Sequence, residues 1–122
     1  MKRKKSNAQL KRKLWPIFAA FIKKRDKGMC FTCGQFAESY GLHAGHFIPK
    51  GAGGLALYFN EDNVHAQCAR CNLFLAGNQY EYGQRLGKRM VADLYRLKQQ
   101  ITKAYPFEEK IAYHTQKLKE LS

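Results

Sequence analysis

The first strong hydrophobic pattern of the chain has the spacing of an amphipathic α-helix. Its members are Ile17, Phe18, Phe21 and Ile22. Pro16 suits the first turn of a helix, because the N–H that proline lacks would have no partner there. The pattern therefore predicts a helix from Pro16 to about Lys24, with Trp15 and Phe18 packing on the segment that follows.

Residues 28–72 have short apolar runs among glycines, cysteines and histidines. Residues 42–48 and 64–67 read as two short strands, and together they predict a β-hairpin with an irregular connection. Residues 49–54 (PKGAGG) form a loop in this interpretation, because glycine accepts either sign of φ.

The C-terminal part of the chain predicts helices. One begins at residues 71–75 and breaks at Gly77. A longer one covers residues 80–103 and ends before Pro106, which cannot continue a helix, and a last one covers residues 107–121. The apolar stripe of the longer helix is Leu86, Met90, Leu94, Leu97 and Ile101, and that of the last is Phe107, Ile111, His114, Leu118 and Leu121.

These elements predict an α+β fold. Three parts are expected: a basic tail over residues 1–13, a central domain over residues 14–85 and a helical extension over residues 86–122. The tail is either a disordered solubilising arm or an arm that lies along phosphates, and both interpretations stay open. A core in a chain of 122 residues is marginally stable without a further crosslink.

The chain is strongly basic, with 22 Lys and Arg against 9 Asp and Glu and a formal net charge of +13. Such a field attracts polyanions, and nucleic acid is the commonest partner of a small basic domain. The alternatives are a solvated basic surface and an anionic membrane surface, but the basic residues do not gather on one amphipathic helix. No segment approaches the ~20 apolar residues of a membrane span.

The N-terminal sequence MKRKK resembles the start of a signal peptide. The apolar run after it contains Pro16, ends at Lys23 and lacks a small-residue cleavage site, so we expect an intracellular protein. Thiols stay reduced in that compartment, and paired cysteines there favour a metal site over disulfides.

Four cysteines form two C-x-x-C pairs, Cys30 with Cys33 and Cys68 with Cys71. Each pair places two thiolates on one turn, and two pairs complete a tetrahedral shell without an open position, which is typical of structural zinc. Gly34 suits a tight turn after the first pair. The alternatives are four unrelated buried cysteines or one redox-active pair, and both leave the second pair unexplained.

The interval between the cysteine pairs carries more polar chemistry than a zinc ribbon needs. It holds HAGHF at residues 43–47 and NEDNVH at residues 60–65, and Asn72 follows Cys71. This order resembles the HNH, or ββα-metal, nucleases. The runs HAGHF, FNEDNVHAQCARCN and the following GN, with WPIFAAFIKKRDKGMCFTCG before the first pair, are similar to the NinG/Rap proteins of lambdoid phages, which are recombination endonucleases for branched DNA. The resemblance covers residues 12–85.

The resemblance implies a small HNH core stapled by zinc, with roles for three residues. His46 would be the general base that takes a proton from water. Asn63 would hydrogen-bond backbone across the hairpin and hold the loop that carries His46. Asn72 would offer an oxygen to a catalytic divalent ion, Mg²⁺ or Mn²⁺.

One position departs from the family pattern. Family members commonly carry Asp or His directly before the general base as the second metal ligand, and here that position is Gly45. His43 would take over the role if a bulge at Gly45 brought it to the side of His46, because residues three apart otherwise point to opposite faces of a strand. His65, which shares a face with Asn63, is the alternative, and we favour His43.

The leading hypothesis is a metal-dependent endonuclease that cuts branched DNA, such as Holliday junctions or D-loops, in the cytoplasm of a bacterium that hosts the phage or prophage. The alternatives are a zinc-dependent DNA-binding module without catalysis and an HNH nuclease for ordinary duplex DNA. The basic side chains that either contact phosphates or stay solvated are Lys50, Arg70, Arg85, Lys88 and Arg89. A homodimer would match a two-fold substrate, with the stripes of the last two helices as its interface, unless these stripes fold back on the core.

Overall fold

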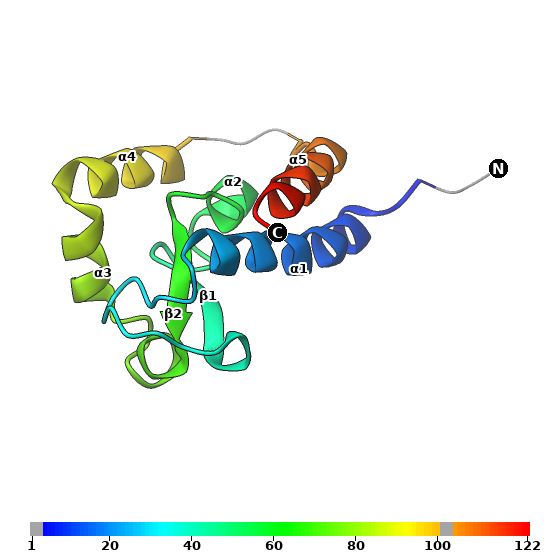
Figure 1. Cartoon of the computed structure of the whole chain (residues 1–122). Helices are drawn as coiled ribbons and strands as arrows, with labels where there is room; N and C mark the ends of the chain where they lie inside the picture. The colour runs from blue at the N-terminus through cyan, green and yellow to red at the C-terminus, as the bar shows by residue number, and fades with distance from the viewer. Residues whose placement is uncertain (1–3, 101–103) are drawn as a thin grey trace.

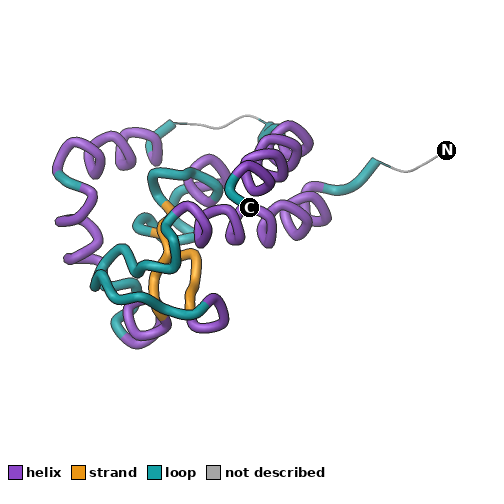
Figure 2. The backbone as a smooth tube through the Cα atoms, in the orientation of Figure 1, coloured by secondary structure: helices purple, strands orange, loops and turns teal. Residues whose placement is uncertain are grey.

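The computed structural model describes residues 4–100 and 104–122 of the chain. Helices surround a small hairpin of two antiparallel strands, so the fold is α+β (Figure 1, Figure 2). The elements in chain order are α1 (Asn7–Arg25), η1 (Ser39–Gly41), β1 (Leu42–His46), α2 (Gly54–Tyr58), β2 (Val64–Cys68), η2 (Arg70–Phe74), α3 (Gln79–Leu86), α4 (Lys88–Lys98) and α5 (Phe107–Glu120). None of the described helices is long and apolar enough to cross a membrane.

Helix α1 begins well before Pro16, so the start predicted there is wrong. Ser6 caps the helix: its hydroxyl accepts the N–H of Gln9 at 3.2 Å, and the Gln9 side-chain oxygen accepts the N–H of Ser6 at 2.8 Å. This reciprocal capping box fixes the first turn. Pro16 lies inside the helix, which continues to Arg25 although proline removes one backbone hydrogen bond. Residues 7–13 of the basic segment are therefore helical.

The two strands pair in a regular antiparallel register over their whole length. The predicted hairpin is confirmed, but the bulge expected at Gly45 is absent, because Gly45 pairs one to one with His65. Successive side chains of a strand point to opposite faces. Ala44 and His46 therefore share one face of β1, and His43 and Gly45 share the other.

The outer edge of β2 is covered by the segment that precedes β1. The carbonyl of Ala66 accepts the N–H of Phe31 at 2.8 Å, and the N–H of Ala66 donates to Asp26 at 2.8 Å. Asp26 is itself paired with Arg25 at 2.8 Å. Within residues 4–100 and 104–122 no second strand pairs with β1, so its outer edge is left for side chains and ligands.

Helix α1 crosses one face of the hairpin, and α5 packs against α1 (Figure 1). Their shared core holds the buried side chains of Leu14, Phe18, Ile22, Ala44, Val64 and Phe107. Helix α5 follows Pro106 directly, as the pattern over residues 107–121 predicts. The first part of its apolar stripe, Phe107, Ile111 and His114, therefore packs onto the core of its own chain, whereas Leu121 is exposed.

The single helix predicted over residues 80–103 is wrong. Gly87, at φ 87°, separates α3 from α4, because glycine adopts this left-handed region without a steric penalty. Helix α4 ends at Lys98, and the predicted end at residue 103, like Ile101, lies outside the described residues. The two helices enclose a second core of Phe47, Ile48, Leu57, Tyr82 and Leu94.

Two short elements also differ from the prediction. Helix α2 begins at Gly54, inside the segment expected to be a loop, and buries Leu57. The helix expected from Cys71 is a single π-helical turn, η2, and the chain reverses after it through Gly77 and Asn78, which have φ values of 87° and 50°. The sharp reversal keeps the second cysteine pair close to the end of β2.

Candidate metal and catalytic site

The four cysteines lie together, with their Sγ atoms all within 4.8 Å of one another. They are free thiols rather than disulfides, and the Cys33 and Cys68 sulfurs are 3.8 Å apart. The predicted cluster is confirmed as four cysteines positioned to hold a metal ion. It ties the turn before β1 to the end of β2 and to η2.

Hydrogen-bond donors surround the sulfurs. The Thr32 hydroxyl lies 3.3 Å from the Cys30 sulfur, and the Asn78 side-chain amide donates to the Cys71 sulfur at 3.6 Å. Burial raises the pKa of Cys30, but hydrogen bonds from Thr32 and from backbone N–H groups outweigh it and lower that pKa to about 6. Burial and the neighbouring sulfurs raise the pKa of Cys33 to about 12. A cation is therefore needed before all four thiols ionise together.

His46 ends β1 on the face toward α1, and its side chain is only 8% exposed. Its ring stacks on Trp15, with centroids 5.5 Å apart. Nε2 lies 2.8 Å from the carbonyl oxygen of Tyr58. Since a carbonyl only accepts, Nε2 carries the ring proton, and Nδ1 keeps a lone pair that no side chain of residues 4–100 or 104–122 engages.

The imidazole of His46 is neutral at ordinary pH. Burial lowers its pKa to about 4, against the hydrogen bond to Tyr58, and the nearby charge of Lys50 lowers it further. A neutral imidazole with one fixed N–H and one open lone pair can accept a proton from water.

Asn63 is fully buried and braces the chain that leaves His46. Its side-chain oxygen accepts the N–H of Ile48 at 2.8 Å, and its side-chain nitrogen donates to the carbonyls of Ile48 at 3.1 Å and Leu57 at 3.0 Å. These are the backbone hydrogen bonds expected of Asn63, and they tie the residue just before β2 to the chain just after β1 and to α2.

Asn63→Ala is expected to lower the free energy of unfolding by about 2–4 kcal/mol, because it leaves the buried N–H of Ile48 and two carbonyls without partners. Urea unfolding of the metal-loaded protein measures the change. Asn7→Ala, at an exposed position of α1, is the matched control. A loss below about 1 kcal/mol in Asn63→Ala would contradict the bracing role.

The opposite face of β1 gathers amide oxygens. A Cβ built on Gly45 would lie 3.0 Å from the Asn72 side-chain oxygen and would overlap the side-chain oxygen of Gln67. His43 and Asn72 both line a groove of about 430 Å³ along the open edge of β1. His43 and Asn72 thus line one groove, but without the bulge His43 stays on the face of β1 opposite His46, so the ligand assignment remains a prediction.

His65, the alternative ligand, has other contacts. Its ring stacks on Phe31 with centroids 4.0 Å apart, and its Nδ1 lies 3.2 Å from the Tyr82 hydroxyl. Burial and the charge of Arg25 lower its pKa to about 4. His65 therefore packs between aromatic side chains, whereas no such contact holds His43 among the described residues.

Basic and aromatic side chains lie in the groove and in a neighbouring hollow that shares Trp15 with it. Lys50 lies 4.9 Å from the centre of the Trp15 ring, and Lys11 lies 4.4 Å from the centre of the Tyr58 ring. Lys23 of α1 lines the groove with Lys50. Sequence reasoning named Lys50 as a side chain that either contacts phosphate or stays solvated, and it gave no individual role to Lys11, Lys23 or Tyr58. The remaining predicted phosphate contacts, which are all exposed, are Arg70, Arg85, Lys88 and Arg89.

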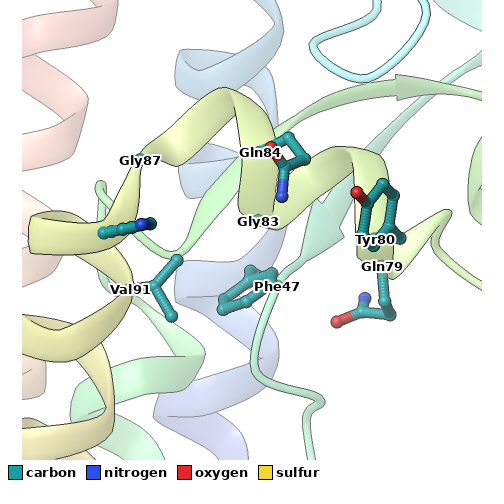
Figure 3. A pocket seen from close by; sticks show the side chains of 8 residues that line it. Phe47, Gln79, Tyr80, Gly83, Gln84, Gly87 and Val91 are labelled. Carbon is teal, nitrogen blue, oxygen red and sulfur yellow. The ribbon is translucent and has the colours of Figure 1, made fainter.

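A larger hollow of about 510 Å³ lies in the angle between α3 and α4 (Figure 3). Phe47 and Val91 face it, with the amides of Gln79 and Gln84 at its rim (Figure 3). Its lining has no histidine, cysteine or carboxylate. It therefore offers neither a general base nor a strong metal ligand.

Comparisons with known proteins point to one family. Residues 1–121 match the family described as Bacteriophage Lambda NinG protein. The chain is 38% identical over 72 residues to Protein ninG of Escherichia phage lambda, a match covering 58% of this chain and 34% of that protein. Protein ninG of Salmonella phage P22 is 36% identical over 72 residues, with the same coverage. The match thus spans about a third of the length of these relatives, and no solved structure matches the chain.

Proposed function

The chain belongs to the NinG family, and from that membership and the geometry of the site we propose that it is a metal-dependent DNA endonuclease of the HNH type. The observation that carries the proposal is the state of His46. It is a buried, neutral imidazole with its N–H fixed on Tyr58 and its other nitrogen without a hydrogen-bond partner in the described part of the chain. It lies at the end of β1, one residue from Gly45, where the oxygen of Asn72 approaches the strand.

Two kinds of metal site are part of this proposal. The four cysteines would hold a structural zinc ion, because four thiolates within 4.8 Å of one another can fill a tetrahedral shell, prefer zinc and leave no position open. Asn72 and His43 would hold a catalytic Mg²⁺ or Mn²⁺ ion. An amide oxygen and an imidazole, completed by phosphate oxygens and water, suit such an ion. When bound, the ion would polarise the scissile phosphate and neutralise the leaving oxygen.

The residues of the chain then perform the proton transfer. Nδ1 of His46 accepts the proton of the attacking water, while the carbonyl of Tyr58 keeps the proton on Nε2 and stabilises the resulting imidazolium. Trp15 holds the ring by stacking, and Asn63 fixes the backbone after it. Lys23 and Lys50 line the groove, and their charges favour the phosphate backbone there.

The pH dependence of cleavage should reflect the low pKa of His46. That pKa is about 4 instead of 6.5, so the base stays unprotonated as the pH falls from about 8 to about 5.5. The single-turnover rate should therefore not fall as the pH passes through 6.5, the ordinary pKa of a histidine. Unfolded His46 binds its proton near pH 6.5, so folding stability falls as the pH drops from there toward the folded pKa. Rates measured across this range at saturating metal test the prediction, and a midpoint near 6.5 would contradict it.

The substrate that the family resemblance favours is branched DNA. We expect the protein to cut a four-way junction at least about tenfold faster than a linear duplex of the same arm sequence, at equal metal concentration. Labelled strands resolved on a denaturing gel give both rates. Equal rates would be consistent with the proposed metal-dependent hydrolysis and would support a nuclease for ordinary duplex DNA. Tight binding without cutting of either substrate would support a zinc-dependent DNA-binding module.

A further inference from the structure

Gln67 has a buried side-chain oxygen with no hydrogen-bond partner among the described residues. The side chain is 0% exposed, in the middle of the packed hairpin. Its nitrogen donates to the carbonyl of Gly77 at 2.8 Å and to the Thr32 hydroxyl at 3.2 Å. Because the Gly77 carbonyl can only accept, the amide nitrogen must face it, and the oxygen must face the other way. Leaving a buried amide oxygen unpaired costs free energy of folding, so we expect a ligand beside this oxygen.

The unpaired oxygen points at Gly45. A Cβ on Gly45 would overlap it and would also lie 3.0 Å from the Asn72 oxygen. Two oxygens that approach the same point, one from β2 and one from η2, are close enough to share an ion with metal–oxygen distances of about 2.0–2.6 Å. His43 pairs directly with Gln67 across the hairpin, so its side chain starts on the same face.

The glycine at position 45 is explained by space rather than by backbone conformation. Gly45 sits in regular strand pairing and is not among the residues with positive φ. A side chain there would displace the Gln67 oxygen and fill the gap between it and Asn72. The absence of a side chain at this position therefore preserves the approach of the two oxygens.

We infer that the Gln67 side-chain oxygen is a ligand of the divalent ion, completing with Asn72 and His43 a site over Gly45. The inference rests on the proposed function and deepens it by naming a ligand from β2. Neutral amide oxygens favour a hard ion such as Mg²⁺ or Mn²⁺ and bind it weakly alone. Phosphate oxygens of bound DNA complete the shell, so ion and DNA bind cooperatively.

Mn²⁺ binding to the zinc-loaded protein on a four-way junction, followed by electron paramagnetic resonance of free Mn²⁺, tests the inference. All proteins carry His46→Ala, so that the DNA stays intact. Adding Gln67→Met should weaken Mn²⁺ binding by at least about tenfold. Adding Gln67→Glu, which keeps an oxygen and adds charge, should tighten it by about tenfold. Gln84→Met, at an exposed amide of α3, is the matched control and should leave the affinity unchanged.

Two outcomes would overturn the inference. One is Mn²⁺ affinity in Gln67→Met equal to that of the parent, and the other is weaker binding in both Gln67 variants, which would show a structural role. Zinc content and thermal unfolding of each variant report on the fold separately. Cleavage by the protein with His46 intact judges the proposed function independently, because a protein can cut DNA with Gln67 playing no part.

Discussion

His46→Ala is expected to lower the single-turnover rate of DNA cleavage by about 100-fold to 10 000-fold, while DNA binding stays within about threefold. The free lone pair of its Nδ1 is the proposed acceptor of the proton from water, and alanine removes it. Binding should persist because the charge of the groove comes from Lys23 and Lys50. Quench-flow or manual time courses with excess enzyme measure the rate, and gel shifts without divalent ion measure binding.

His114→Gln supplies the matched control for this loss. His114 is also a buried imidazole, but it lies on α5 and packs against Phe18 and Phe21. Its replacement should reduce stability and leave the cleavage rate of the folded protein within about threefold. A rate for His46→Ala within threefold of the parent, with normal zinc content, would remove His46 from the mechanism.

Removal of the structural metal is expected to unfold the protein. Structural zinc typically contributes an apparent free energy of about 10–16 kcal/mol at neutral pH, as much as the whole stability of a small domain. The four sulfurs join the turn before β1, the end of β2 and η2. A chelator, or Cys68→Ser, should abolish the cooperative thermal transition seen by circular dichroism.

Elemental analysis of the same proteins identifies the metal. Elemental analysis of the purified protein should give one zinc ion per chain, and Cys68→Ser should lower that value together with the transition. Cys→Ser keeps the size of the side chain while removing the thiolate, so loss of the fold would report on metal binding. A chelated protein that unfolds at the same temperature as the untreated protein would contradict the structural role.

Periodicity predicted the hairpin and α5 well, because their patterns agree with their packing. It failed at α1 because the proline signal was read as a start, although the stronger signal was the Ser6 and Gln9 capping box. It failed between α3 and α4 because the apolar stripe continues through Gly87, and only the backbone shows the break.

The candidate site was predictable where chemistry follows spacing. Two C-x-x-C pairs specify a cysteine cluster, and the structure confirms it. Gln67 carries no such signal, because one amide in a strand is ordinary in sequence. Its importance depends on an oxygen left unpaired opposite Gly45, a relation between residues that only the paired strands reveal. Trp15 was expected in the core, but its stacking on His46 could not be predicted from the sequence.

The most direct test of the central proposal is cleavage of a labelled four-way junction by the zinc-loaded protein, with Mg²⁺, with Mn²⁺ and with no added divalent ion. The proposed chemistry predicts strand cutting with either ion and none without. The catalytic ion would bind at Asn72 and His43, and zinc at the four cysteines has no open position with which to replace it. Binding of the junction with no cutting in any of the three conditions would contradict the assignment of the groove along β1 as a nuclease site.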